Sequence, residues 1–265
     1  NERAILDVIS KQENKIKTIG FAHAVHSTGL LYMRRRKEGY FNSPKPDIIA
    51  VTGQDALKWC VNWANIPAQQ IEVIGSPRFT TPVPVKSTEL ERSDCLNVLI
   101  LSALKFELPM LVNFLEEDRS LFDNCNLWIR KYPFYWIHEQ NMAISEIHRY
   151  VKNIKTETSP LYHQIDWSDV VIFSSTSAGI EAMLRGRYTI NIGLHDLFQT
   201  DPLINKGDLS KVIRCSTPED LRRILNSVRN ISKEKLSNIV DNQIDYATGI
   251  YSPIDMNKLK EIILI

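Results

Sequence analysis

One stretch of the sequence decides the fold: Val170-Val171-Ile172-Phe173-Ser174-Ser175-Thr176-Ser177-Ala178-Gly179-Ile180-Glu181-Ala182-Met183. Its first four residues are all apolar, which is typical of a strand that is covered on both faces. Ile180, Met183 and Leu184 then recur at three and four residues, which predicts a helix. Four hydroxyl residues join the two elements. The stretch therefore indicates a strand, a polar turn and a helix, the repeating unit of an α/β fold.

The same alternation recurs along the chain. Helical spacing follows most of the apolar runs, and Thr217 before Pro218 marks a further helix start, because a hydroxyl caps the helix and proline suits its first turn. Ser232 begins another helix, and residues 255–265 are expected to be helical. The other expected strands are 17–21, 47–51, 71–74, 97–101, 127–129, 188–192 and 211–213. The order predicts parallel sheets flanked by helices.

A polar segment divides the chain. Residues 75–93 contain Pro77, Pro82 and Pro84, which favour a connection between domains. We expect a partial N-terminal domain at 1–80, a linker at 81–94, a nucleotide-binding domain at 95–250 and a C-terminal helix at 251–265. The first domain would hold about three strands, fewer than the roughly five or six of a doubly wound sheet, so it is expected to be truncated.

Composition excludes several classes of protein. The 265 residues include 32 Lys and Arg against 31 Asp and Glu, and 43% are hydrophobic, which excludes disorder and gives no general attraction to nucleic acid. No apolar run approaches the ~20 residues of a membrane span. The sequence contains no Walker loop, no Gly-x-Gly-x-x-Gly and no Cys-x-x-Cys pair, and its four cysteines are expected to be reduced thiols of a cytosolic protein.

The polar turn is the first candidate site. Its small side chains would let a ligand approach the backbone, and the N–H groups of a helix's first turn attract phosphate or carboxylate. Hydroxyls of Ser174, Ser175, Thr176 and Ser177 would add donors, beside Ala178 and Gly179. The alternative is simple capping by Ser175 or Ser177, which explains one or two hydroxyls but not four.

Part of this sequence resembles the donor-binding half of GT-B glycosyltransferases. The resemblance lies in Ser174-Ser175-Thr176-Ser177-Ala178-Gly179, then in Glu181-Ala182-Met183, Gly186 and 189–193. The likeness is greatest to bacterial surface-carbohydrate enzymes that use CMP-linked acidic sugars such as Kdo or sialic acid. It covers about residues 20–193, and the hydroxyl run is its most specific part. The resemblance implies an α/β fold of two Rossmann-like domains of GT-B type, with the nucleotide held by the C-terminal domain and its ribose near Glu181.

Further residues fit this resemblance. Lys105 and Glu107 follow the strand at 97–101, where the family places groups near the donor, and Lys131 is a candidate for phosphate. Tyr132 stands where CMP-sugar transferases have histidine in Arg/Lys-x-His-Pro, and it cannot replace the charge of an imidazole. For Lys131 a solvated strand-end cation is the equal alternative.

The N-terminal part offers acid–base candidates. His23 and His26 come just after the first expected strand, and Arg78 follows Gly75-Ser76-Pro77 after the third. Because ligands gather at the carboxyl ends of strands, these residues are expected to line the cleft, with Arg78 on phosphate or a sugar carboxylate. A structural role for either histidine stays open. No carboxylate or other third ligand lies at a spacing from His23 and His26 that is typical of a metal site, so we expect no metal.

The sequence leaves the reaction open between several hypotheses. The leading one is metal-independent transfer of a sugar from a nucleotide donor, CMP-linked in the finer form, to a saccharide or lipid-linked acceptor in bacterial surface polysaccharide synthesis. His23, His26 or Glu107 would be the base if configuration inverts, and Glu107 the nucleophile if it is retained. The alternatives are a non-catalytic nucleotide-sugar-binding module, or a degenerate half acting with a partner, and a sugar-nucleotide epimerase.

The expected partners and location follow from these hypotheses. No cofactor is expected beyond the donor substrate, and no nucleic acid. The expected location is the cytoplasm, with its membrane face as an alternative, because the basic and aromatic run at 32–41 could contact anionic lipid. A solvated loop is the simpler interpretation of that run.

Overall fold

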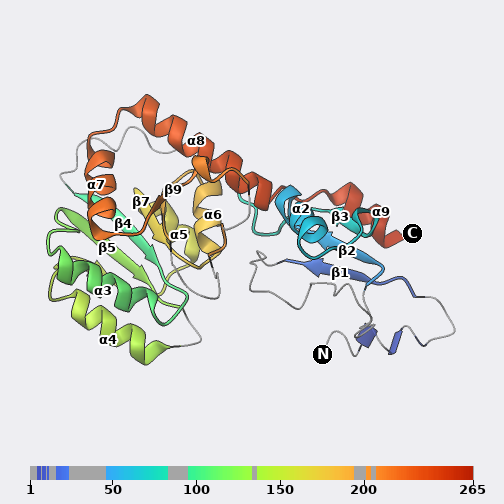
Figure 1. Ribbon diagram of the computed structural model, residues 1–265, viewed down its shortest axis with the longest axis horizontal. Helices are drawn as coiled ribbons and strands as arrows, with labels where there is room; N and C mark the ends of the chain where they lie inside the picture. The colour runs from blue at the N-terminus through green and yellow to red at the C-terminus, as the bar shows by residue number, and fades with distance from the viewer. Residues whose placement is uncertain are drawn as a thin grey trace. The chain divides into compact units, whose positions relative to one another are not determined.

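The architecture comes from a computed structural model, which describes residues 5–6, 8–9, 11, 16–23, 46–82, 95–132, 136–193, 201–203 and 207–264. The chain divides into two compact units (Figure 1). The first unit combines residues 1–79 with 205–207 and 248–265, and the second combines 80–204 with 208–247. Each unit is described by itself.

The second unit is built on a six-stranded parallel sheet. In space the strands follow the order β6-β5-β4-β7-β8-β9, and every neighbouring pair is parallel. Counted along the chain, this is the order 3-2-1-4-5-6 of nucleotide-binding doubly wound sheets. The strands are β4 (Leu96–Leu101), β5 (Cys125–Arg130), β6 (Ile154–Lys155), β7 (Val170–Phe173), β8 (Tyr188–Ile192) and β9 (Ile213–Cys215).

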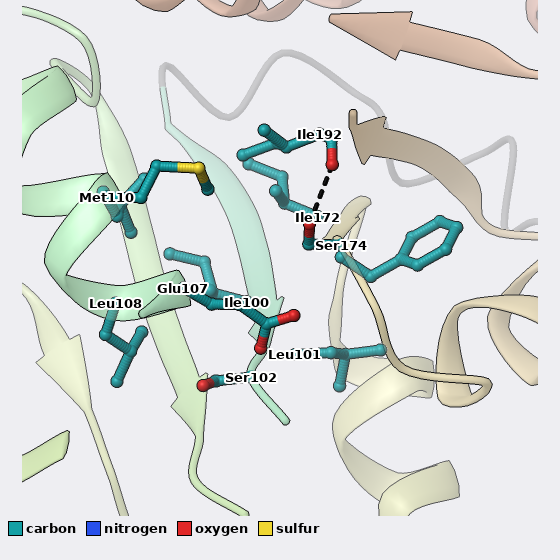
Figure 2. Close-up of a pocket in the computed structure, with 11 residues that line it drawn as sticks. Ile100, Leu101, Ser102, Glu107, Leu108, Met110, Ile172, Ser174 and Ile192 are labelled. Atoms are coloured by element: carbon teal, nitrogen blue, oxygen red, sulfur yellow. Dashed lines mark hydrogen bonds between the residues drawn. The ribbon is translucent and has the colours of Figure 1, made fainter. Parts of the chain in front are cut away.

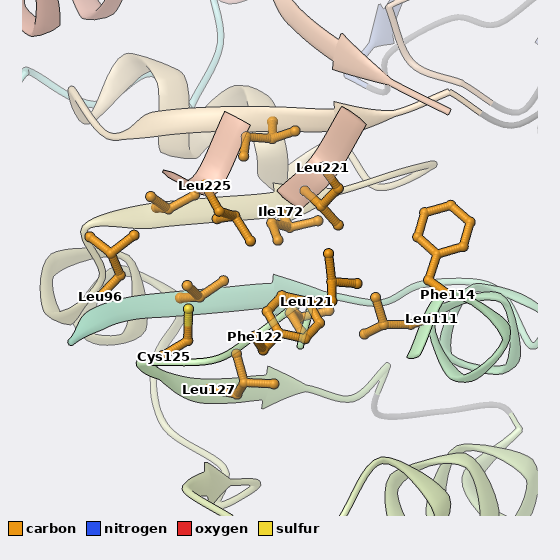
Figure 3. Close-up of a cluster of buried hydrophobic side chains, with 14 of the residues drawn as sticks. Leu96, Leu111, Phe114, Leu121, Phe122, Cys125, Leu127, Ile172, Leu221 and Leu225 are labelled. Atoms are coloured by element: carbon orange, nitrogen blue, oxygen red, sulfur yellow. The ribbon is translucent and has the colours of Figure 1, made fainter. Parts of the chain in front are cut away.

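Helices pack on both faces of this sheet. One face of the sheet shares a large apolar core with four helices, and Leu111, Ile144 and Leu225 belong to this core. Figure 3 shows Leu111 and Leu225 in it. These helices are α3 (Glu107–Glu117), α4 (Ile137–Ile147), α7 (Pro218–Arg229) and α8 (Lys233–Ile250). The opposite face carries α5 (Leu161–Trp167) and α6 (Ala178–Leu184), as Figure 1 shows. A short 3-10 helix, Leu209–Lys211, precedes β9.

The first unit has a smaller parallel sheet. Its strands β1 (Ile19–Ala22), β2 (Ile48–Val51) and β3 (Ile71–Val73) lie in sequence order. Helix α2 (Gln54–Asn62) packs on this sheet through Trp59 and Cys60, and a 3-10 turn, Ala68–Gln70, leads into β3.

The C-terminal segment completes this first unit. Ser252 N donates to Thr52 O and Ser76 N to Ser252 O, both at 2.9 Å. The Thr52 hydroxyl donates to Ile250 O at 2.9 Å. Helix α9 (Met256–Leu264) then buries Ile262 in a core shared with β2. Residues at opposite ends of the chain therefore build one unit.

The structure agrees with most of the expected elements. Val170–Phe173 and Tyr188–Ile192 are strands with the expected bounds, and the Thr217 hydroxyl caps α7 by accepting from Asp220 N at 3.1 Å. The bounds of the strand expected at 211–213 are wrong. Leu209–Lys211 forms a 3-10 turn, and β9 begins only at Ile213. Two-residue β6 was not expected. Most of the expected linker, residues 83–94, lies outside the described residues.

Candidate functional site

The second sheet creates its crevice between β4 and β7. These strands are neighbours, with Leu101 opposite Phe173, but the chain leaves them in opposite directions, to α3 and to α6. In open α/β sheets, ligands bind outside the carboxyl ends of strands at such a point of reversal. The two loops that begin here, 102–106 and 174–177, therefore frame the candidate site.

Glu107 joins these two loops. Its side chain is buried, with the residue 5% exposed. Its Oε2 accepts from Leu104 N at 2.8 Å and from Ala103 N, and its Oε1 accepts from Ser175 N at 2.9 Å and from the Ser175 hydroxyl. Four donors hold the two oxygens, so little lone-pair capacity is left. This geometry favours a positioning role for Glu107 over the expected one of base or nucleophile.

The hydroxyl run is largely occupied by internal hydrogen bonds. Ser174 is buried and donates from Oγ to Ile192 O at 2.8 Å, while Ser175 donates to Glu107. Thr176 Oγ1 accepts from Ala178 N at 3.2 Å. The hydroxyls of Ser174 and Ser175 thus donate within the protein, and the donation to an anion expected of the run stays a prediction. Ser177 lies at the N-cap of α6 with a partly exposed side chain.

Gly179 fixes how closely α6 approaches the sheet. A Cβ at this position would lie 2.3 Å from the ring of Phe173. The glycine thus serves helix packing, and Ala178 beside it keeps the first turn small. Small residues here have a structural reason in addition to any role in binding.

A small pocket opens between the ends of β4 and β7 (Figure 2). Its volume is about 20 Å³, enough for roughly one water-sized group. The polar residues of its wall are Ser102, Glu107 and Ser174, and the rest are apolar. Ser102 is 7% exposed, and its Oγ has no hydrogen-bond partner among the residues that the structure describes. Sequence reasoning missed Ser102, although its position directly after β4 is a signal for it.

Cations border the site on the β4–β5 side. Lys105 is exposed in the loop before α3, and its Nζ lies 5.0 Å from the ring centroid of Trp136. Lys131 follows β5, and its Nζ donates to Asn141 Oδ1 at 3.2 Å. Trp136 has φ 62°, a left-handed conformation that is rare for an aromatic residue, and is 42% exposed.

Glu181 interacts with a residue that the prediction did not single out. Arg130 ends β5, and its Nη1 donates to Ser159 O at 2.7 Å and to Gln164 Oε1 at 2.6 Å. Burial lowers the pKa of the Arg130 guanidinium, and the negative charge of Glu181 opposes this shift. Arg130 thus provides a held positive charge at the carboxyl edge of the sheet, beside the predicted ribose contact.

The remaining candidates belong to the first unit. His23 is exposed just after β1, with its ring 6.2 Å from that of Phe21, and Arg78 is exposed in the turn after β3. His26 lies outside the described residues, as does the basic and aromatic run at 32–41. Roles in catalysis or binding for His23, His26 and Arg78 stay predictions.

The described part of the chain has neither a group of metal-binding side chains nor a membrane-spanning helix. In those ranges no three His, Cys, Asp or Glu side chains are grouped so that they could hold a metal ion. None of the helices described is both long and apolar enough to cross a membrane.

Comparison with known proteins gives matches only at the level of structure. No family model matches the sequence, and no curated protein matches it either. Among solved structures, HepE from Anabaena, in complex with UDP and glucose, gives a TM-score of 0.54 at 14% identity. The match covers 83% of this chain but 62% of HepE, so the chain spans less than two thirds of that protein.

Two other matches extend over more of the chain. A glycosyltransferase from Rickettsia africae gives a TM-score of 0.56 at 12% identity over 98% of this chain and 80% of its own. A candidate UDP-N-acetylglucosamine 2-epimerase from Listeria monocytogenes gives a TM-score of 0.50 at 14% identity, over 93% of this chain and 74% of its own.

These likenesses show the fold. The chain is α/β with two Rossmann-like domains of GT-B type, as the sequence predicted. The resemblance to CMP-sugar transferases in particular stays a prediction.

Proposed function

We propose that this protein is a glycosyltransferase that takes a sugar from a nucleotide-activated donor bound by its second unit. The observation that carries the proposal is the GT-B fold, shared over 98% of the chain with a Rickettsia africae glycosyltransferase. The site at the carboxyl ends of β4 and β7 supports it, because nucleotides bind there in sheets of this strand order.

The nucleotide of the donor is proposed to be UDP. HepE, whose fold is similar, was determined with UDP and glucose. Tyr132 stands where CMP-sugar transferases have histidine, which weakens the case for CMP. A CMP-linked acidic sugar is retained as the second donor to be tested, and a saccharide or lipid-linked acceptor of surface polysaccharide synthesis is part of the same proposal.

The cations at the site suggest how the leaving group would be stabilised. When the acceptor oxygen bonds to the anomeric carbon, the bond from that carbon to the donor phosphate breaks, and its electron pair stays on the phosphate oxygen. Lys105 and Lys131 would offset this charge, a contribution that needs no metal. The acceptor proton would pass to a base, for which His23 or His26 is proposed because Glu107 is already saturated with donors.

A second candidate function is epimerisation of a nucleotide sugar. It is favoured by the similarity in fold to the Listeria monocytogenes chain. A non-catalytic binding module is the third outcome, and the saturation of Glu107 fits it as well.

Nucleotide titration followed by turnover tests separates these functions. We expect UDP to raise the melting temperature more than CMP or GDP, and UDP-glucose or a related sugar nucleotide to be hydrolysed slowly or consumed with an acceptor. Conversion of UDP-N-acetylglucosamine to its 2-epimer would instead establish the epimerase. Binding of a sugar nucleotide without turnover on any acceptor would support the non-catalytic binding module.

A pair of lysine variants tests the site itself. Lys105→Ala should weaken UDP binding about tenfold, the loss typical of a hydrogen bond to a charged group. Lys152→Ala is the matched control, because Lys152 is also exposed but precedes β6, at the amino edge of the sheet. Equal affinities for the two variants would place the nucleotide elsewhere.

A further inference from the structure

The hydroxyl of Ser102 has an unusual environment for a buried polar group. Ser102 is 7% exposed, and its Oγ has no hydrogen-bond partner in the described part of the chain. Buried hydroxyls nearly always have a partner, because an unsatisfied one costs free energy of folding. The neighbouring Ser174 shows the usual case, with its hydroxyl donated to Ile192 O at 2.8 Å. The unsatisfied group therefore needs an explanation.

Ser102 lines the pocket between β4 and β7, and this pocket restricts what could satisfy its hydroxyl. Figure 2 shows Ser102 near the Glu107 carboxylate, with Leu108 and Leu101 on either side, while Ile172 lies farther away, beside Ser174. A volume of about 20 Å³ admits a group of one oxygen. A negatively charged oxygen is disfavoured beside a buried carboxylate. A neutral hydroxyl fits, because it can both donate to and accept from Ser102 Oγ.

We infer that Ser102 Oγ binds a neutral hydroxyl group on the sugar of the nucleotide-sugar substrate, and that Ser102 is a specificity-determining residue of this site. The inference rests on the proposed function for the identity of the ligand. It moves the ligand contact from the hydroxyl run, whose Ser174 and Ser175 are occupied internally, to the end of β4. A site that hydrogen-bonds a substrate hydroxyl strongly rejects a ligand that lacks it.

The test compares Ser102→Ala with Ser174→Ala. Both residues are buried serines on the wall of the same pocket, but only Ser174 has an internal partner. Calorimetry would measure binding of UDP-glucose, UDP-galactose, UDP-N-acetylglucosamine and UDP alone. We expect Ser102→Ala to weaken the best-bound sugar nucleotide tenfold or more and to leave UDP within twofold of wild type. Ser174→Ala should not change the ratio of the two affinities.

Thermal unfolding of the ligand-free proteins adds an independent readout. Ser102→Ala should melt at the same or a higher temperature than wild type, because it removes an unsatisfied hydroxyl, whereas Ser174→Ala should melt lower. A lower melting temperature for Ser102→Ala would mean that the hydroxyl has a partner within the folded protein, such as a buried water, and would overturn the inference.

The outcomes also separate this inference from the proposed function. Equal losses for UDP and the sugar nucleotide would put the contact on phosphate and overturn the inference alone, as would an unchanged affinity for the sugar nucleotide. If wild type bound no nucleotide or sugar nucleotide, the proposed function would fail. The inference, which rests on that function, would then fail with it, and the melting temperature of Ser102→Ala would show only whether the hydroxyl is satisfied within the folded protein.

Discussion

Glu107 owes its role to residues far away in the sequence. Its carboxylate accepts from amides of its own loop and also from Ser175, which is 68 residues further along the chain. The strand order brings the two together, because β4 and β7 are neighbours. A residue that joins the loops 102–106 and 174–177 would affect the candidate site without contacting a ligand itself.

Glu107→Gln tests this role by exchanging one acceptor oxygen for a donor. The amide would point N–H groups at backbone N–H groups, so we expect a loss of about 3 kcal/mol in the free energy of unfolding. Urea denaturation measures it. Glu116→Gln is the control, since Glu116 is exposed near the other end of α3, and it should cost under about 0.5 kcal/mol. Equal costs would contradict the role given to Glu107.

The cysteines differ in their surroundings. Burial raises the pKa of Cys60 to about 11, of Cys125 to about 11 and of Cys215 to about 12. The thiolate is the reactive form, so these three should react slowly with a disulfide reagent at pH 8. Cys95 is partly exposed and should react first.

Thiol titration at pH 8 should therefore give one fast phase that corresponds to one thiol. The other three thiols should react quickly only after denaturant has unfolded the protein. Because the pKa values are raised in the folded state, stability is full at neutral pH and falls as the pH rises above the pKa of an unfolded thiol, about 8.5. Four fast thiols in the folded protein would show that these sites are open to solvent.

At the scale of the element, the positions of most strands were predictable, but the hydrogen bonds of the residues that follow them were not. The four apolar residues before Ser174 specify β7, and Thr217 with Pro218 specifies the start of α7, because burial on both faces and capping are local properties. Two-residue β6 was not predictable, since it is too short to have a pattern. The hydrogen bonds that occupy Ser174 and Ser175 depend on β8 and α3. No local sequence pattern predicts them, because these elements are distant in the sequence.

The contact between α6 and β7 can be tested with two glycines at the same edge of the sheet. Gly179→Ala would put a Cβ 2.3 Å from the Phe173 ring, so we expect a loss of about 3 kcal/mol in the free energy of unfolding. For Gly193→Ala the nearest atom is Arg214 Nη2 at 3.1 Å, so the guanidinium, which pairs with Asp201, would have to shift by only a few tenths of an ångström. That control should cost under about 1 kcal/mol by urea denaturation. If Gly179→Ala were as mild, α6 would not need the glycine for its packing.

At the scale of the whole molecule, the C-terminal residues are part of the first unit. Asp255 N donates to Ile74 O at 3.0 Å, and Ile262 packs with Ala50 and Ile74. The sequence predicted a helix at 255–265 but not its partner, because long-range packing leaves no signal in the spacing of apolar residues. The alternation of strands and helices predicted the α/β class, the proline-containing segment at 75–93 predicted the division into two domains, and the GT-B type came from the family resemblance.

Neighbouring isoleucines on α9 test this packing. Ile262 is 5% exposed and Ile263 is 62% exposed. Ile262→Ala should cost about 2–4 kcal/mol and raise hydrogen exchange at the amides of β2 and β3. Ile263→Ala should leave both unchanged. Faster exchange confined to the second sheet would contradict the assignment of α9 to the first unit.

This arrangement has a consequence for how the protein is made. A ribosome releases β2 early and Ile262 about two hundred residues later, yet both belong to one core. The second sheet has all its strands once Cys215 has emerged, so it can become stable while the nascent first sheet still lacks its last partner. The first sheet, which is translated before the second, is thus expected to mature after it, and chaperones that shield exposed apolar surface would act on the first sheet longer.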